Sequence, residues 1–207
     1  LNGNVLMLKF AEKKREAETK IVANELEKLN FNLKELPNEK NILAEGGEFY
    51  FCPKDKLLFS GINRNTIAGA ECVASFLNAN ELILIDTPSF HLDTVFTTIF
   101  DKQGALSAMI VCKELITKDS FKNLEKISKK LNVHIIIIPK KDSVGTDDYL
   151  GSLAVNSFCA PGLLISSSHY SDFSVEQKLD SLGVKTEVCP VSQFQLSGGS
   201  VHCITNE

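Results

Sequence analysis

Three short segments of the chain hold side chains that could act together on a cationic molecule. Cys203 follows a Gly-Gly-Ser stretch, His91 and Asp93 alternate within Phe-His-Leu-Asp-Thr, and Glu45 and Glu48 flank two glycines. A thiolate is a nucleophile, an imidazole moves protons, and carboxylates orient an imidazole or bind a cation. Brought together, these residue types would make a nucleophilic thiol site.

Each of these signals also has an ordinary structural interpretation. Cys203 could be a thiol of the core, and Glu45 and Glu48 could be solvated residues of a glycine turn. His91 and Asp93 could form a pair on the surface. The residue types alone leave these alternatives open.

Several carboxylates beside a thiolate indicate which ligand would bind. A planar guanidinium offers paired N–H donors to carboxylates, so a guanidino compound would fit such a site. Zinc is the alternative, but structural zinc sites usually show closely spaced ligand pairs, and this sequence has no Cys-x-x-Cys pair. We therefore expect no metal ligands.

The remaining cysteines have a different expected role. They lie in apolar stretches and are expected to be buried thiols in a reducing compartment. They are Cys52, Cys72, Cys112, Cys159 and Cys189.

Composition limits the function classes. The 207 residues are 43% hydrophobic and 23% charged, with a formal net charge of −4. This length and apolar content suit one well-packed domain. The acidic balance without a basic block argues against a nucleic-acid partner and a polybasic membrane anchor. Apolar runs such as Ile135–Ile138 are far shorter than the roughly 20 residues of a membrane span. We expect a cytoplasmic protein.

Helical patterns recur at a regular interval. Apolar residues at helical spacing predict helices over Ala11–Leu29, Thr66–Leu77, Asp119–Leu131 and Ser174–Leu182. The interval between successive starts is about 54 residues, a period typical of closed or stacked arrays.

The segments between the helices repeat as well. A strand is predicted after each helix, over Phe31–Leu36, Glu81–Ile85, Val133–Ile138 and Lys185–Cys189. Two strands precede each of the last three helices: Glu48–Phe51 and Lys56–Ser60, His91–Thr97 and Ala105–Val111, and Ser152–Phe158 and Gly162–Ser166. Only Val5–Phe10 precedes the first helix, and Ser200–Thr205 is predicted as a strand without a unit of its own.

The unit is therefore strand, strand, helix, strand, and the spacing favours a circular array over an α/β fold with coincidental intervals. Cys203, His91 and the two glutamates lie on or just before the opening strands of their units. Equivalent positions of a circular array converge on its axis, so these side chains would meet in one central cavity.

Six segments in this order carry a family resemblance: AEGGEFYF, FSGINRNTIAGAECVASFL, FHLDTVFTT, SLAVNSF, CPVSQF and GGSVHCIT. The chain resembles the guanidine-modifying enzyme superfamily over essentially all its length. This superfamily includes dimethylarginine dimethylaminohydrolase, arginine deiminase, agmatine deiminase and the amidinotransferases. The resemblance implies the α/β pentein fold, a five-bladed propeller of ββαβ units with pseudo-fivefold symmetry around a central site.

The resemblance also implies a role for each candidate residue. Cys203 would be the nucleophile, and His91 the general acid and base. Glu45 would orient the imidazole and help to hold the guanidinium, and Asp93 would clamp the guanidinium nitrogens. Glu48 matches an acidic position of the substrate site.

Recognition of a substrate carboxylate is less clearly implied. The family's carboxylate-binding arginine corresponds to Asn65, with Arg64 one place earlier. Lys13, Lys14 and Arg15 match a basic pair of the family, and the alternative is a solvated helix start.

The implied reaction is hydrolysis at the guanidinium carbon of arginine or a methylated arginine. It would pass through a thiouronium on the cysteine and give citrulline with ammonia or an amine, with no cofactor. The alternatives are an amidinotransferase, an agmatine-type deiminase or a non-catalytic pentein binding protein. The implied partner is a small guanidino substrate, with neither nucleic acid nor membrane, and a homodimer is possible.

Length adds one expectation. At about 54 residues a unit, the chain holds close to four units of a five-unit fold. We expect residues 1–207 to form a single catalytic pentein domain that lacks its N-terminal unit. A substrate-binding aspartate of the family would lie before the strand that begins near Val5.

Overall fold

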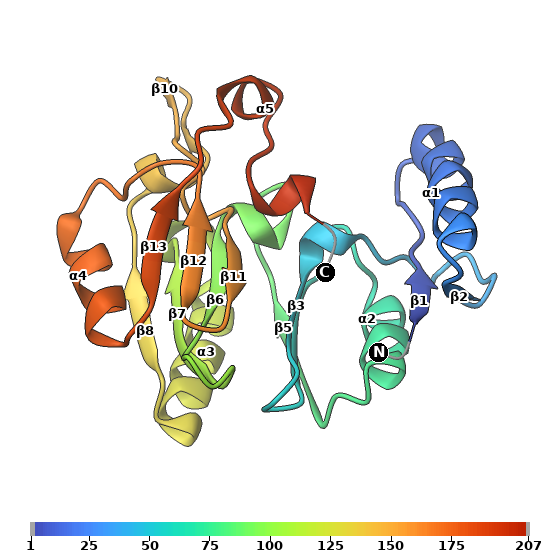
Figure 1. The fold of residues 1–207 in the computed structure, drawn as a ribbon, viewed down its shortest axis with the longest axis horizontal. Coiled ribbons are helices and arrows are strands. Elements are labelled where there is room, and N and C mark those ends of the chain that lie inside the picture. The colour runs from blue at the N-terminus through green and yellow to red at the C-terminus, as the bar shows by residue number, and fades with distance from the viewer. Residues whose placement is uncertain (1–2, 206–207) are drawn as a thin grey trace.

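The computed structural model describes residues 3–205, whose strands form four sheets and one short hairpin (Figure 1). Three sheets have three strands each and share one topology. The first strand runs antiparallel to the second, and the second runs parallel to the third. A helix links the parallel strands each time, because parallel neighbours need a crossover connection. The predicted ββαβ unit and the α/β class are confirmed.

The three complete units follow one another along the chain. The first consists of β3 (Phe49–Cys52), β4 (Leu57–Gly61), α2 (Ile67–Phe76) and β5 (Glu81–Ile85). The second consists of β6 (Phe96–Phe100), β7 (Leu106–Val111), α3 (Lys118–Leu131) and β8 (His134–Ile137). The third consists of β11 (Phe158–Ala160), β12 (Leu163–Ser166), α4 (Phe173–Ser181) and β13 (Lys185–Val188).

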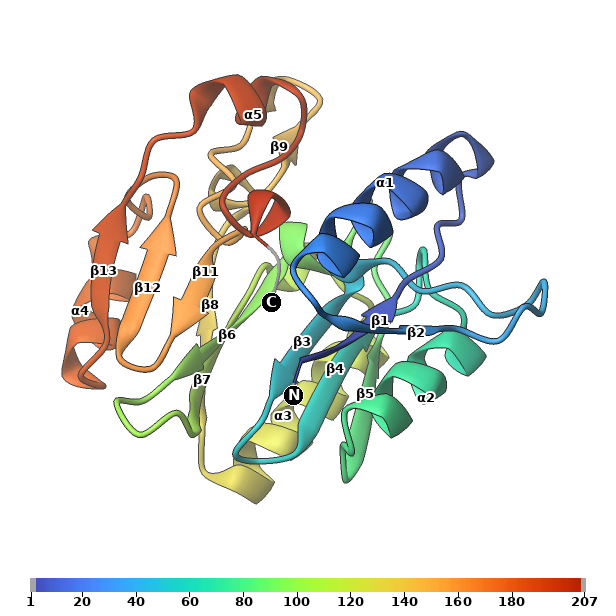
Figure 2. The same ribbon diagram turned by 45° about the vertical axis from the view of Figure 1, so that its right-hand side comes forward.

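Other elements lie before and between these units. Strands β1 (Asn4–Met7) and β2 (Asn32–Glu35) pair in parallel, with helix α1 (Glu16–Lys28) between them. A hairpin of β9 (Gly145–Thr146) and β10 (Tyr149–Leu150) and the helix α5 (Ser192–Leu196) are elements that the sequence pattern does not predict. The four sheets follow one another around the turn at residues 202–204 (Figure 2).

Capping side chains decide where the helices of the repeat begin. Thr66 caps α2, Thr117 caps α3 and Asp172 caps α4, each by accepting a hydrogen bond from a backbone N–H of the first turn. The start predicted at Thr66 is therefore confirmed to within a residue. The starts predicted at Asp119 and Ser174 are each one residue late.

Two predicted strands are turns in the structure. Over residues 91–97, His91 precedes the 3-10 turn η3 (Leu92–Thr94), and β6 begins only at Phe96. Over residues 200–205, the chain forms the 3-10 turn η6 (His202–Ile204). Polar side chains capture backbone N–H groups of both turns, which competes with strand pairing. The strand predicted over residues 152–158 is also wrong, since only its last residue enters β11.

The sheets supply most of the core. All residues of β4 and β6 are buried, and the largest fully buried side chains include Phe59, Phe96 and Met109. Helix α3 buries Phe121, Leu124 and Ile127 against the main core, as its pattern predicts. A smaller cluster lies against α2, and it contains Leu36, Ile42, Ala44, Leu58 and Val73.

Helix α1 departs from its predicted pattern. An amphipathic helix usually packs its apolar face inward, yet the exposed fractions of Ile21 and Leu29 are 64% and 68%. The sheet beside it has two strands, so it offers this helix less surface than the three-stranded sheets offer theirs. The amphipathic pattern of α1 is real, but its apolar side is not covered by the described chain.

The cysteine prediction is correct in part. Cys52, Cys112 and Cys159 are buried, Cys72 is half-buried and Cys189 is exposed. Cys189 directly follows the four-residue strand β13, in which alternate side chains are exposed. All six cysteines of the chain are free thiols.

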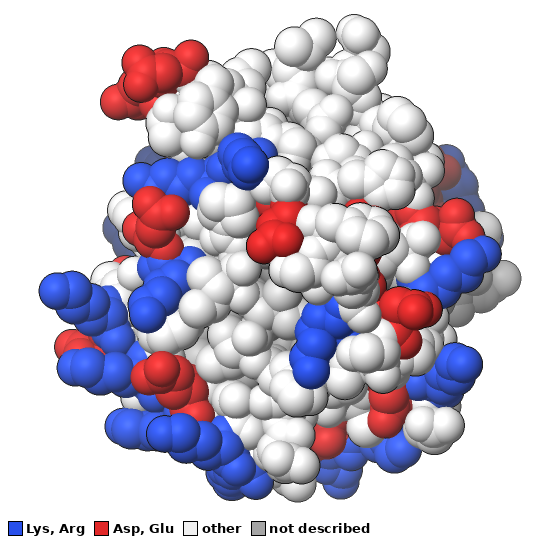
Figure 3. All heavy atoms as spheres, turned by 90° about the vertical axis from the view of Figure 1, so that its left-hand side faces the viewer, with Lys and Arg blue, Asp and Glu red and all other residues white. Residues whose placement is uncertain are grey.

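Charge is mixed over the surface. On the face shown in Figure 3, Lys and Arg side chains stand among Asp and Glu side chains, and the upper part carries few charges apart from an acidic group at its left edge. The exposed apolar residues Tyr149, Leu150, Phe194 and Leu196 belong to β10 and α5. Within residues 3–205, no helix has the length and apolarity to cross a membrane.

Candidate active site

Glu45 belongs to a buried cluster of polar side chains and contacts several of its neighbours through both carboxylate oxygens. It stands before the 3-10 turn η2 (Gly46–Glu48), and its side chain is 2% exposed. One carboxylate oxygen, Oε1, accepts a hydrogen bond from the backbone N–H of Ala11 (2.9 Å). The other, Oε2, accepts from Nε2–H of His91 (2.9 Å) and lies 3.8 Å from a guanidinium nitrogen of Arg15.

The contact with Glu45 indicates which nitrogen of the His91 ring carries a proton. An ionised carboxylate can only accept, so Nε2 carries the proton of this hydrogen bond. The other ring nitrogen, Nδ1, lies over Gly47, where an added Cβ would be 2.8 Å from it. The same Cβ would lie 3.0 Å from Oδ2 of Asp93. Gly47 therefore lets the backbone approach both side chains, and Nδ1 faces the interior of the cluster.

Asp93 contacts the turn that holds Cys203. It lies in η3 and is 1% exposed. Its Oδ2 accepts a hydrogen bond from Nδ1–H of His202 (3.0 Å) and from the thiol of Cys203 (3.4 Å). Its other oxygen, Oδ1, is buried and has no hydrogen-bond partner among the described residues. A buried bare carboxylate oxygen is costly unless a donor arrives.

Cys203 is an exposed residue, while its sulfur contacts polar partners. Nδ2–H of Asn156 donates to Sγ (3.2 Å), and Sγ donates to Oδ2 of Asp93. Burial of the sulfur and the neighbouring Asp93 carboxylate raise the pKa of Cys203 to about 11. At neutral pH the residue is therefore a thiol in the free protein. In the described chain, no hydrogen bond joins Cys203 to His91.

Glu48 lies beneath this cluster and is fully buried. Its oxygens accept hydrogen bonds from the backbone N–H groups of Arg64 (2.8 Å) and Leu92 (2.9 Å). Burial raises the pKa of Glu48 to about 7, and the nearby acids Asp93 and Glu45 add to the rise. A Cβ at Gly61 would overlap the Glu48 carboxylate, so that glycine makes room for it. Contact of Glu48 with substrate stays a prediction.

Arg64 and Asn65 point in different directions. Asn65 is buried; its Oδ1 accepts from the backbone N–H of Glu45 (2.7 Å) and its Nδ2 donates to Ser60 (3.2 Å). The guanidinium of Arg64 stacks on Phe90, 4.2 Å from the ring centroid, and lies 3.3 Å from a carboxylate oxygen of Glu12. Of these two neighbours, only Arg64 therefore offers a cationic group at the edge of the cluster.

The structure thus brings most of the predicted residues into one cluster. Glu45 contacts His91 directly, and Asp93 contacts Cys203 directly, across 46 and 110 residues of sequence. Arg15 joins the cluster through Glu45, whereas Lys13 and Lys14 are exposed. The roles implied for these residues stay predictions.

Two residues of the cluster are absent from the sequence-based prediction. His202 lies in the segment predicted as a strand, yet in η6 it is buried, donates to Asp93 and stacks on the ring of Tyr50. Asn156 is buried and contacts Cys203. A polar residue inside the apolar stretch Leu-Ala-Val-Asn-Ser-Phe is the signal that could have found Asn156, since a buried amide needs partners.

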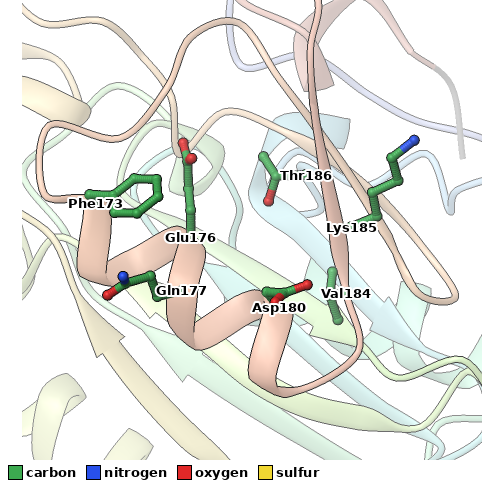
Figure 4. Close-up of a pocket in the computed structure, with 7 residues that line it drawn as sticks. All are labelled: Phe173, Glu176, Gln177, Asp180, Val184, Lys185 and Thr186. Atoms are coloured by element: carbon green, nitrogen blue, oxygen red, sulfur yellow. The ribbon is translucent and has the colours of Figure 1, made fainter.

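Two surface hollows lie apart from the cluster. One, of about 300 Å³, lies between α4 and β13 and is lined by Phe173, Glu176, Gln177, Asp180, Val184, Lys185 and Thr186 (Figure 4). The other, of about 440 Å³, is lined by Lys141, Leu150, Gly151, Ser152, Ser192, Gln195 and Leu196. Neither is lined by a cysteine or a histidine, so the buried cluster is the better candidate for chemistry. Residues 3–205 contain no group of three or more His, Cys, Asp or Glu side chains placed to hold a metal ion.

Comparison with solved structures identifies the fold. The N-terminal domain of ArgZ, an arginine dihydrolase of Cyanobacteria, has a TM-score of 0.79 and 22% identity over 98% of this chain and 69% of that domain. AgrE with ornithine and NAD+ has a TM-score of 0.78 and 21% identity over 98% of this chain and 28% of its own. SxtG, an amidinotransferase of Microseira wollei in saxitoxin biosynthesis, has a TM-score of 0.70 and 15% identity over 97% of this chain and 63% of its own.

Comparisons of sequence give no match: neither a protein-family model nor a curated protein matches the chain. The structural likeness shows the fold, which is the α/β fold of these pentein enzymes. The fold implied by the sequence resemblance is therefore confirmed. The closed five-bladed ring with pseudo-fivefold symmetry stays a prediction.

Proposed function

We propose that the chain is a guanidine-modifying hydrolase that acts on arginine or a methylated arginine. The observation that carries this proposal is the bare, buried Oδ1 of Asp93, whose other oxygen contacts the thiol of Cys203. A ligand that donates to this oxygen lies beside the nucleophile. A guanidinium suits it because its N–H donors lie in one plane and its charge offsets the carboxylate.

The charges of the cluster favour a cation over a neutral ligand. Asp93 and Glu45 are both buried, and the charged or ionisable groups near the oxygens of Glu45 are the edge of Arg15 and the His91 ring. A bound cation would offset the Asp93 charge that opposes ionisation of Cys203. Substrate binding would therefore favour the thiolate, which is the reactive form of the cysteine.

The covalent step starts from this bound state. The thiol proton of Cys203 passes to His91, and the thiolate adds to the central guanidinium carbon to form a C–S bond. The imidazolium of His91 then gives a proton to the departing nitrogen as its C–N bond breaks. Ammonia or an alkylamine leaves, and the substrate remains on Cys203 as a thiouronium.

Hydrolysis completes the cycle. His91 takes a proton from a water molecule as the hydroxide adds to the thiouronium carbon. The C–S bond then breaks, the added hydroxyl gives its proton to solvent to form the ureido C=O, and the proton on His91 returns to the sulfur to restore the thiol. The product is a ureido compound, citrulline when the substrate is arginine. Glu45 holds the Nε2–H of His91 through both steps, so Nδ1 is the nitrogen that exchanges protons.

The choice among guanidino substrates rests on the neighbours. ArgZ is an arginine dihydrolase, and its complex with substrate was obtained with a variant in which a cysteine is replaced by serine. This agrees with an essential cysteine and favours arginine here. A dimethylargininase-like activity is the alternative among the hydrolases, and it differs only in the amine that leaves. We propose that residues 1–207 act as one catalytic domain.

The test is a ureido-product assay with arginine, the methylarginines and agmatine. The wild-type chain should convert at least one of them, and Cys203→Ser should convert none while keeping the wild-type circular dichroism spectrum. Product formation by Cys203→Ser would refute the nucleophile assignment. A new guanidino compound, formed without ureido product when a second amine such as ornithine or glycine is added, would mean an amidinotransferase, an activity that SxtG has on the same fold.

A further inference from the structure

Asn156 holds the candidate nucleophile at two points. Its Nδ2–H donates to Sγ of Cys203 (3.2 Å), and its Oδ1 accepts from the backbone N–H of the same residue (3.3 Å). Its backbone oxygen accepts from the backbone N–H of His202 (3.3 Å). One buried residue, 47 positions away in sequence, thus makes three hydrogen bonds to the turn η6.

The segment that presents Asn156 is itself fixed. The backbone N–H of Asn156 donates to the oxygen of Leu153 (3.0 Å), and that of Val155 donates to Asp142 (3.1 Å). Leu153 is buried, and its backbone has a left-handed conformation, with φ of 52°. Such a conformation in a non-glycine residue persists only where surrounding contacts over-determine it, which is common beside functional sites.

We propose that Asn156 is a positioning residue, which aims the Cys203 sulfur and stabilises its thiolate; this rests on the proposed function of Cys203 as nucleophile. A thiolate accepts hydrogen bonds more strongly than a thiol, so the bond from Nδ2–H gains strength when the proton leaves. The amide has no charge to lose, so it acts in this way at every pH of interest.

The sulfur is therefore set between two opposing partners. The Asp93 carboxylate lies 3.4 Å away and disfavours the thiolate, while the Asn156 amide at 3.2 Å favours it. The carboxylate can be offset by a cationic substrate, whereas the amide acts before and after binding. Asn156 would thus keep the nucleophile usable once the substrate has neutralised Asp93.

The decisive variant is Asn156→Asp. Aspartate has nearly the same shape, and one of its oxygens can still accept from the backbone N–H of Cys203. The other oxygen would replace the Nδ2–H donor and face the sulfur with a negative charge. If the role of Asn156 were purely structural, the retained hydrogen bond would preserve it. Stabilisation of the thiolate, in contrast, would be lost in this variant.

The measurement is the rate of iodoacetamide alkylation of Cys203 from pH 7 to 11, followed by mass spectrometry of the peptide. The exposed Cys189 in the same sample is the internal control for reagent and pH. In Asn156→Asp, alkylation at pH 8 should slow by about tenfold or more, since a thiol whose pKa rises by one has a tenfold smaller thiolate fraction. Cys189 should be unchanged.

An unchanged pH profile of Cys203 in a folded Asn156→Asp protein would overturn the proposal. If this variant does not fold, as judged by circular dichroism, Asn156→Ala removes the donor without adding charge. The pH profile of Cys203 alkylation in Asn156→Ala should then shift to higher pH by less than expected for Asn156→Asp, with alkylation at pH 8 roughly threefold slower than in the wild type. An unchanged profile in that variant would be equally decisive against the proposal.

The proposed function can fail separately. A shifted alkylation profile together with no turnover of any guanidino compound by the wild-type chain would support Asn156 and refute the hydrolase. Turnover by the wild type together with an unshifted profile would support the hydrolase and refute the role of Asn156. Where both hold, kcat should fall more than KM rises, because Asn156 contacts the cysteine rather than the substrate.

Discussion

Replacing Asp93 by asparagine should have opposite effects on the reactivity of the thiol and on turnover. The change removes a negative charge 3.4 Å from Sγ of Cys203. It keeps an oxygen that can accept the hydrogen bond from Nδ1–H of His202, so the turn η6 should stay in place. It also replaces the bare oxygen meant for a guanidinium by an N–H group.

The effect on the thiol follows from the distance. Two unit charges 3.4 Å apart interact by about 1.2 kcal/mol in a solvent-like dielectric, which is close to one pKa unit. Burial is the larger cause of the raised pKa of Cys203, about 11 instead of 9.0, and Asp93 is the second. Asp93→Asn should therefore lower that pKa by about one and speed alkylation at pH 8 up to about tenfold.

Turnover should move in the other direction. Removing one partner of a buried ion pair costs about 3–5 kcal/mol, which corresponds to a loss in kcat/KM of at least about 10²-fold. The two assays are the alkylation of Cys203, with Cys189 as the internal control, and ureido-product formation. Slower alkylation in Asp93→Asn would refute the electrostatic account of the thiol. Turnover within tenfold of wild type would refute Asp93 as the guanidinium acceptor.

Three further changes test other parts of the cluster. Gly47→Ala places a Cβ 2.8 Å from Nδ1 of His91 and 3.0 Å from Oδ2 of Asp93, so kcat/KM should fall roughly 10²-fold with the fold kept; an active variant would contradict the close approach. Glu48 has its pKa raised from 4.5 to about 7, so the stability it contributes is present below pH 4.5 and is lost as pH rises through 7. Between pH 4.5 and 7, the free energy of unfolding in urea should fall by up to about 3 kcal/mol more for the wild type than for Glu48→Gln. An equal dependence on pH in the two proteins would refute the raised pKa of Glu48. Arg64→Gln should reduce kcat/KM for arginine about tenfold more than for agmatine, which lacks the carboxylate; equal losses would remove Arg64 from carboxylate recognition.

The regular part of the fold could be predicted from the sequence because its signals are local. Apolar spacing over ten or so residues defines α2 and α3, and β5 begins and ends where the pattern predicts. The interval of about 54 residues then gives the ββαβ unit without knowledge of any tertiary contact.

The same local signals failed where side chains replace backbone pairing. The alternation of His91 and Asp93 suggests a strand, yet Glu48 captures the N–H of Leu92 and the segment turns. Helix α1 shows a proper apolar stripe, but burial depends on what lies opposite, and the stripe remains exposed. Neither outcome can be read from spacing, because both depend on partners distant in sequence.

By itself, the sequence determined the repeat and the types of residue available for chemistry. The tertiary structure alone decided which of them meet, since Cys203 reaches Asp93 across 110 residues and Asn156 across 47. It also decided the state of the thiol, because a pKa depends on burial and on charges a few ångströms away, which only the packing of distant turns sets. For the same reason Asn156 and His202, unremarkable in the sequence, belong to the cluster that surrounds the nucleophile.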